Sequence, residues 1–159
     1  MEACHAELNG AQEYRVPIER EPRISAVKGD HVGWYWPKVA DWLRAALAEA
    51  VHHELNIQDV YRRCKCGDSL MLAIALGDDL CGVGVLDYSV DPKGDGYVLV
   101  YACGGESMPQ WIGLFMDTCK TIALERGARR VLMVGRRGWQ PFLEARGAKL
   151  RCICMSMEV

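Results

Sequence analysis

The chain has 159 residues, half of them hydrophobic, and a formal net charge of −2. This length suits a single domain with a real core. On electrostatic grounds, the charge balance of the whole chain argues against a nucleic-acid binder. No apolar run approaches the roughly 18 residues that cross a bilayer, and the first residues have neither the basic start nor the apolar stretch of an export signal. We therefore expect a protein of a cytoplasm-like compartment that is neither secreted nor embedded in a membrane.

Eight cysteines without an export signal indicate reduced thiols. Cys64 and Cys66 form one Cys-x-Cys pair, and Cys152 and Cys154 form another. A zinc site needs four converging ligands, and its usual Cys-x-x-Cys spacing is absent. Small core residues are the simpler interpretation of most of these cysteines, and no metal site is predicted.

Residues 1–22 are polar and mixed in charge, which predicts an extended N-terminal arm before a domain over residues 23–159. A short strand is expected at 24–27, followed by a turn. Pro37 suits the first turn of a helix. The apolar residues after it recur with helical spacing along one face: Val39, Trp42, Leu43, Ala46, Leu47 and Ala50.

Asn56 and Asp59 form the pattern of an N-terminal cap, which predicts a short helix over 56–65 that ends before Gly67. Strand-like runs follow at 69–76, 80–90 and 97–103, with turn residues between them, so an antiparallel meander is expected. Gly82 and Gly84 lie inside the middle run. They indicate a bulge or a close approach of another backbone.

The clearest helix begins at Ser107, which with Gln110 has the pattern of a capping box, and it ends at Gly127. A buried strand at 131–134 follows, so this strand and the one at 97–103 form a parallel, right-handed βαβ unit. A short helix over 137–148 and a closing strand over 149–159 complete the chain. The expected fold class is α/β of the α+β kind, with a mixed, mostly antiparallel sheet, one parallel pair and helices on both faces.

This order of elements resembles the GNAT superfamily of N-acetyltransferases over residues 23–159. The resemblance is strongest in LERGARRVLMVGRRGWQPFLEARGAKL, residues 124–150. It implies a fold that holds acetyl-CoA where the fourth and fifth strands splay apart, and that transfers the acetyl group to an amine.

The family's pyrophosphate loop reads Arg/Gln-x-x-Gly-x-Gly/Ala, and the matching segment here, residues 107–112, reads Ser-Met-Pro-Gln-Trp-Ile. It has no glycine and no arginine, Pro109 has no N–H to give, and Met108 and Trp111 are bulky. Two glycines just before it could form a loop in a shifted register. If acetyl-CoA binds, the candidate cofactor residues are Gly104, Gly105, Ser107 and Gln110.

The family's second signature is a tyrosine on the last helix that protonates the departing thiolate, and Leu143 stands at that position. Tyr101 is a weak candidate for a replacement acid, although a half-buried strand residue is the simpler interpretation. Glu106, just before the long helix, is a weak candidate for a general base, or else a plain charge at the helix start. Cys103 is better explained as a core thiol than as a nucleophile.

Two further groups are candidates for binding a partner. Arginines cluster around the strand at 131–134. A solvated basic rim, a contact to a CoA phosphate, a contact to an acidic protein surface and a contact to a nucleic-acid backbone are all open for them. Trp34 and Trp36 offer an aromatic recognition surface, and at least one of them is exposed if that stretch is extended. The candidate partner-binding residues are Trp34, Trp36, Arg136 and Arg137.

The chain also resembles small phage and prophage proteins, among them GNAT-like internal virion proteins with a similar Phe-Leu-x-x-x-Gly-Ala ending. Together with the two missing signatures, this resemblance implies a fold that has lost acetyl-CoA chemistry, has no cofactor, and serves as a structural or protein-binding component. Its partners would be other virion components or a host protein. Only one strand's length of chain follows Gly147, so a partner or a second copy is a way to complete the sheet. The alternative is an acetyl-CoA-dependent N-acyltransferase that acts on an amine.

Overall fold

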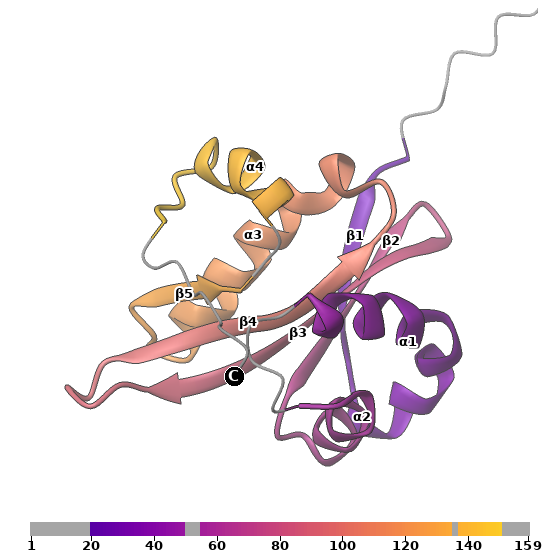
Figure 1. Ribbon diagram of the computed structural model, residues 1–159, viewed down its shortest axis with the longest axis horizontal. Helices are drawn as coiled ribbons and strands as arrows, with labels where there is room; N and C mark the ends of the chain where they lie inside the picture. Colours follow the sequence, from indigo (N-terminus) through magenta and orange to yellow (C-terminus); the bar gives the residue numbers. More distant parts are fainter. Residues whose placement is uncertain (1–19, 50–54, 135–136, 151–159) are drawn as a thin grey trace, which may run out of the picture.

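The computed structural model describes residues 20–49, 55–134 and 137–150. These residues form one twisted five-stranded sheet, with α1 and α2 on one face and α3 and α4 on the other (Figure 1). Helices therefore cover both faces, as the sequence predicts. Of the expected arm at 1–22, only residues 20–22 are described, and Pro22 already begins the first strand.

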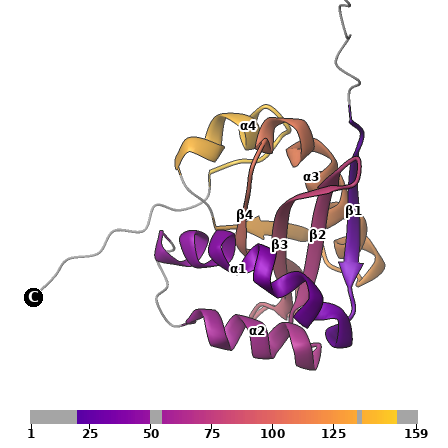
Figure 2. The ribbon, with the colours of Figure 1, turned by 90° about the vertical axis from the view of Figure 1, so that its right-hand side faces the viewer.

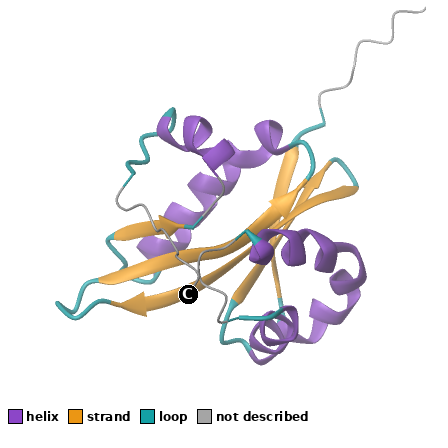
Figure 3. Cartoon of the chain, in the orientation of Figure 1, coloured by secondary structure: helices purple, strands orange, loops and turns teal. Residues whose placement is uncertain are grey.

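The sheet has the order β1-β2-β3-β4-β5 (Figure 3). Neighbouring strands are antiparallel from β1 to β4, and β4 and β5 are parallel. The fold class and the single parallel pair are confirmed. The strands are β1 (Pro22–Val27), β2 (Leu70–Leu76), β3 (Asp79–Val90), β4 (Gly96–Gly105) and β5 (Arg130–Met133).

Helix α1 (Val32–Ala48) begins five residues before the expected start at Pro37, so Pro37 lies inside the helix. The prediction was wrong because the chain enters the helix through a 3-10 turn, Gly29–His31. Val32, fully buried, then anchors the first helical turn in the core. Burial of this turn outweighs the backbone hydrogen bond that Pro37 cannot make.

Helix α2 (Ile57–Cys66) has the predicted cap. The side-chain oxygen of Asn56 accepts hydrogen bonds from the N–H groups of Gln58 (2.9 Å) and Asp59 (3.0 Å), and the Asp59 carboxylate accepts from the N–H of Asn56 (3.3 Å). Gly67 ends the helix with φ of 84°, a conformation that favours glycine.

Helix α3 (Met108–Glu125) is present, but the expected capping box between Ser107 and Gln110 is not. Ser107 has φ of 54° and its side chain caps nothing; its carbonyl instead accepts from the N–H of Gln110 (2.9 Å). A 3-10 turn, Arg137–Trp139, leads into α4 (Gln140–Glu144), which is shorter than expected. The expected closing strand at 149–159 lies, beyond its first two residues, outside the described part of the chain.

The two glycines in β3 make room for aromatic rings of α3. A Cβ atom on Gly84 would lie 2.4 Å from the ring of Phe115, and one on Gly82 would lie 3.2 Å from the ring of Trp111. The predicted close approach is confirmed: side chains make it at Gly84, and at Gly82 the backbone carbonyl of Gly104, 3.3 Å from the same Cβ position, takes part as well. The predicted bulge is also present, because Ile74 pairs with Gly82 and Ala75 with Leu80, which leaves Cys81 as the extra residue.

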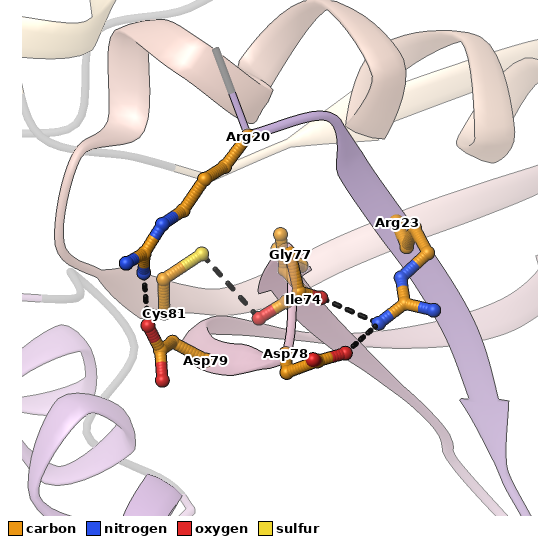
Figure 4. A network of polar contacts seen from close by, with 7 residues as sticks. All are labelled: Arg20, Arg23, Ile74, Gly77, Asp78, Asp79 and Cys81. Carbon is orange, nitrogen blue, oxygen red and sulfur yellow. Dashed lines mark hydrogen bonds and ion pairs between the residues drawn. The ribbon is translucent and has the colours of Figure 1, made fainter. Parts of the chain in front are cut away.

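The β2–β3 turn is tied to the start of β1 (Figure 4). Arg20 pairs with Asp79, and Arg23 binds both the Gly77 carbonyl and the Asp78 carboxylate. The thiol of Cys81 donates to the Ile74 carbonyl at 3.4 Å, so the bulge keeps a polar contact. These contacts fix one end of β1 at the outer edge of the sheet.

Candidate functional site

Strand β4 continues beyond the end of β5, and we call this part of β4, which has no β5 partner, the splay. Their pairing runs from Tyr97 opposite Arg130 to Val100 opposite Met133, and ends where the Val134 N–H donates to the Val100 carbonyl (3.1 Å). Strand β4 continues to Gly105 without a β5 partner. A second bulge lies at the point of separation, since Leu86 pairs with Val100 and Val85 with Ala102, leaving Tyr101 as the extra residue. The pairing of β4 with β5 therefore ends in the region where the family resemblance implies a splay, and residues 135–136 lie outside the described part of the chain.

The start of α3, beside this splay, offers few backbone donors. Pro109 has no N–H, and the Gln110 N–H already binds the Ser107 carbonyl. The Glu106 N–H donates to the Cys81 carbonyl at 2.7 Å. Free N–H groups at a helix start are what hold a diphosphate. In this segment the N–H groups of Glu106 and Gln110 are therefore engaged, and Pro109 has none.

Trp111 does not stand at the mouth of this helix, contrary to our expectation. Its ring is fully buried against the sheet over Gly82, and its indole N–H donates to the Glu106 carbonyl at 2.7 Å. Trp139 packs against it edge to face, with ring centroids 6.4 Å apart. Met108 is half-buried and packs against the same core. Trp111 therefore packs α3 against the sheet, and the bulky side chains at the start of the helix are those of Met108 and Pro109.

Gly104 and Gly105 belong to β4 rather than to a shifted loop. A Cβ atom on Gly104 would lie 2.8 Å from the Trp42 carbonyl, and one on Gly105 would lie 2.3 Å from the Cys81 carbonyl. Both glycines thus allow backbones to pack closely. Ser107 and Gln110 are exposed at the helix start. Of the four candidate cofactor residues, Gly105, Ser107 and Gln110 are exposed and Gly104 is half-buried.

Tyr101 takes part in a polar network between α2 and the sheet. Its hydroxyl donates to the Ser69 hydroxyl (3.0 Å), which in turn donates to the Asp87 carboxylate (2.6 Å). Arg63 donates to both Asp87 (2.8 Å) and Ser69 (3.1 Å). We call Arg63, Ser69, Asp87 and Tyr101 the α2 network. Sequence analysis missed its first three members, because they stand far apart in the chain and match no motif.

The structure does not bring the two weak catalytic candidates together. The hydroxyl of Tyr101 is engaged in the α2 network, while Glu106 is exposed at the far end of β4. Burial raises the pKa of Tyr101 to about 12, although the Ser69 hydrogen bond acts in the opposite direction. Tyr101 is held as a neutral phenol, in the half-buried strand position that the sequence favoured.

This shift predicts a late step in the spectroscopic titration of the tyrosines. Because the pKa of Tyr101 in the folded protein lies above its ordinary value near 10, the unfolded chain ionises first and the native state loses stability as pH rises from about 10 to 12. We expect tyrosinate absorbance to show a component near pH 12 that is missing from Tyr101→Phe. A titration of Tyr101→Phe that matches the wild type at every pH would contradict this assignment.

The remaining chemical candidates are core or surface residues. Cys103 is buried, and burial raises the pKa of its thiol, which supports the core interpretation. Leu143 is half-buried on α4 against the α3 core. Cys64 is buried in α2 and Cys66 exposed, while Cys152 and Cys154 lie outside the described residues. Within the described ranges, no cluster of three metal-ligating side chains occurs.

The two candidate partner tryptophans lie in α1 rather than in an extended stretch. Trp34 is 73% exposed and stacks on His31 with ring centroids 4.5 Å apart. Trp36 is half-buried and packs edge to face on Tyr61 at 4.8 Å. Helical spacing therefore turns only Trp34 outward.

The predicted basic rim is partly neutralised. Arg129 pairs with Asp95 (3.4 Å) and Arg130 pairs with Asp91, both on the β3–β4 turn. Arg136 lies outside the described residues, and only the backbone of Arg137 is described. The acidic β3–β4 turn therefore contacts the arginines at the start of β5.

Two cavities lie away from the splay. One, of about 220 Å³, lies near the start of β2 and is lined by Ser69, Asp87 and Tyr88, among others. The other, of about 440 Å³, lies between α1 and the outer strands of the sheet. We call it the α1–β1 groove, and its lining residues are Arg23, Ser25, Trp34, Tyr35, Lys38, Ala73, Ala75, Asp78 and Leu80.

A search for membrane spans found no helix in the described ranges with the length and apolar character to cross a bilayer. This finding agrees with the absence of a long apolar run in the sequence.

No protein-family description matches the sequence, and no curated protein matches it. Solved structures do match. Ribosomal-protein-alanine N-acetyltransferase from Brucella melitensis biovar Abortus 2308 has a TM-score of 0.62 at 14% identity, over 87% of this chain and 99% of that one. An aminoglycoside acetyltransferase from an uncultured soil metagenomic sample, in complex with sisomicin, has a TM-score of 0.63 at 10% identity, over 87% and 96%.

Glucosamine-6-phosphate N-acetyltransferase from Arabidopsis thaliana matches with a TM-score of 0.54 at 13% identity, over 86% of this chain and 97% of that one. At these identities the likeness concerns the fold and carries no activity with it. The strand order, the splay of β4 and β5 and these three matches agree. The chain therefore has the fold of the GNAT acetyltransferases.

Proposed function

We propose that this protein uses the GNAT fold as a protein-binding scaffold and has lost acetyl-CoA transfer. It would act as a component of an assembly, of the kind that small phage proteins form, inside a bacterial host or in a virion. The observation that carries the proposal is the start of α3. There Pro109 lacks an N–H and the Gln110 N–H is taken by Ser107.

The missing general acid supports the same proposal. Leu143 has no proton to give, and the hydroxyl of Tyr101 is committed to Ser69 with its pKa raised by burial. The exposed ring of Trp34 supplies what a binding protein needs, an aromatic side chain that a partner can cover.

Titration calorimetry with acetyl-CoA tests this proposal. We expect no saturable heat with acetyl-CoA up to about 1 mM, and no shift of the melting temperature, because no backbone cradle holds the diphosphate. Saturable binding in the micromolar range would contradict the proposal.

The alternative function, an acetyl-CoA-dependent N-acyltransferase, is favoured by the open splay between β4 and β5. It predicts binding that Gln110→Glu weakens at least about tenfold, because a carboxylate there would repel the diphosphate. Gln58→Glu is the matched control, since Gln58 is also exposed in the first turn of a helix but lies on α2. An equal loss of affinity for acetyl-CoA in both variants would argue against this site.

A further inference from the structure

The outer edge of β1 has backbone groups that face away from the sheet. The Gly77 N–H donates to the Glu21 carbonyl, so these opposed residues form a hydrogen-bonded pair. Such pairs alternate along an antiparallel ladder. Arg23, Ser25 and Val27 therefore turn their backbone groups toward β2, and Ile24 and Ala26 turn theirs outward.

This edge is open in the described part of the chain. Figure 2 shows β1 at the outer border of the sheet, and no described strand lies beyond it. Ser25 and Ala26 are exposed. Pro22 sits where its backbone nitrogen faces outward, so it costs the β1–β2 ladder no hydrogen bond. A strand added beside β1 would find two N–H and two C=O groups, from Ile24 and Ala26.

The α1–β1 groove lies beside this edge. The side chains of Arg23 and Ser25 point into it, and its floor is made of small residues of β2, Ala73 and Ala75. Trp34 and Tyr35 form its wall. In an added strand every second side chain would point to the α1 side, toward this aromatic wall.

The charged side chains of the groove favour an acidic occupant over a second copy of this chain. Arg23 is already bound to Asp78, whereas no ion pair within the described residues engages Lys38, which is exposed on the groove wall. Lys28, just beyond β1, is also exposed, but the exposed carboxylate of Asp30 lies two residues further on, so Lys38 is the cation that characterises the groove. A second copy of this chain would bring the same cations to the same edge. An acidic segment would instead pair with them.

We propose that the β1 edge and the α1–β1 groove together bind an extended acidic segment of a partner protein, which adds a strand to the sheet. Apolar side chains of the segment cover Trp34, and carboxylates meet Lys38. This inference rests on the proposed binding function and names its surface and the chemistry of its partner. It is a case of strand addition, in which backbone pairing gives affinity and the groove gives selectivity.

The probe is a blocked ten-residue peptide in which every second residue is Thr and the residues between are Val and Glu in turn, so that Val and Glu lie on the same face of the added strand. We call it the Val–Glu peptide, and the Val–Lys peptide, its counterpart, has Lys in place of each Glu. We expect the full-length protein to bind the Val–Glu peptide by fluorescence anisotropy, and the Val–Lys peptide at least about tenfold more weakly. Trp34→Ala and Lys38→Glu should each weaken binding of the Val–Glu peptide by about tenfold or more.

Ala26→Pro is the decisive variant. It removes an outward N–H but no hydrogen bond of the β1–β2 ladder. We therefore expect an unchanged melting temperature and no binding of the Val–Glu peptide. Leu124→Ala is the control, because Leu124 is 76% exposed but lies on α3. Its binding should equal that of the wild type.

Three results would overturn the inference. They are no binding of the Val–Glu peptide at about 1 mM, unchanged binding by Ala26→Pro, and a stable dimer in sedimentation that Ala26→Pro dissociates. The acetyl-CoA titration is independent of them. Peptide binding together with acetyl-CoA binding would refute only the loss of chemistry, and absence of both would refute only the docking surface.

Discussion

Gly84→Ala is expected to destabilise the protein by about 3 kcal/mol, at the upper end of the usual cost of overpacking. The new methyl group would lie 2.4 Å from one ring carbon of Phe115 and 2.5 Å from the next. Phe115 is fully buried and packs edge to face against Trp111, so its ring has no room to move. Urea unfolding followed by circular dichroism measures the change.

A second substitution separates this clash from a loss of backbone freedom. Phe115→Leu alone should cost about 1–2 kcal/mol, and the double variant should be less destabilised than the sum of the two by at least about 1 kcal/mol. Gly33→Ala is the control, since its added methyl would have no atom nearer than 3.7 Å and would favour helix α1. Strict additivity of Gly84→Ala and Phe115→Leu would show that the ring is not the cause.

Asp87→Ala is expected to cost about 2–3 kcal/mol of the free energy of unfolding, less than a fully buried pair because both partners keep some contact with water. The side chains of Arg63 and Asp87 are 32% and 20% exposed. The substitution leaves the Arg63 guanidinium without its carboxylate and the Ser69 hydroxyl without its acceptor. Chemical unfolding at pH 7 is the measurement.

Asp117→Ala is the reference variant, which measures the change in the free energy of unfolding when an exposed ion pair is lost. Asp117 and its partner Lys120 are 73% and 53% exposed, so its loss should change stability by no more than about 0.5 kcal/mol. Asp87→Asn keeps an oxygen for Ser69 and should fall between the two. If Asp87→Ala costs no more than Asp117→Ala, the α2 network contributes no more to the free energy of unfolding than one exposed ion pair does.

Regular patterns made most of the fold predictable. Alternation and turn residues located the strands, and Asn56 with Asp59 located the start of α2 because the cap is a local interaction. Pro37 misled the prediction of α1, since burial of Val32 is a tertiary effect that overrides a local preference. Ser107 misled the prediction of the α3 cap, where the backbone rather than the side chain satisfies the Gln110 N–H.

The candidate site was predictable only in outline. The resemblance gave the splay of β4 and β5, and counting along the chain located the start of α3. Helical spacing puts Trp111 on the same face of α3 as Phe115, but it could not reveal that the ring packs over Gly82, some thirty residues earlier. The α2 network joins Arg63 to Asp87 across two strands. Neither the spacing of the residues in the sequence nor the amino-acid composition predicts such a contact.

The extra residue at Tyr101 changes which core each residue of β4 joins. Val98 and Val100 belong to the α3 core, whereas Tyr101 and Ala102 both pack toward α1 and α2. The inside–outside phase of the strand is thus reversed at this one position. An alignment of this chain with a protein that has an uninterrupted strand here needs a one-residue gap at Tyr101. Without that gap, every β4 residue beyond it would be compared with one from the opposite side of the sheet.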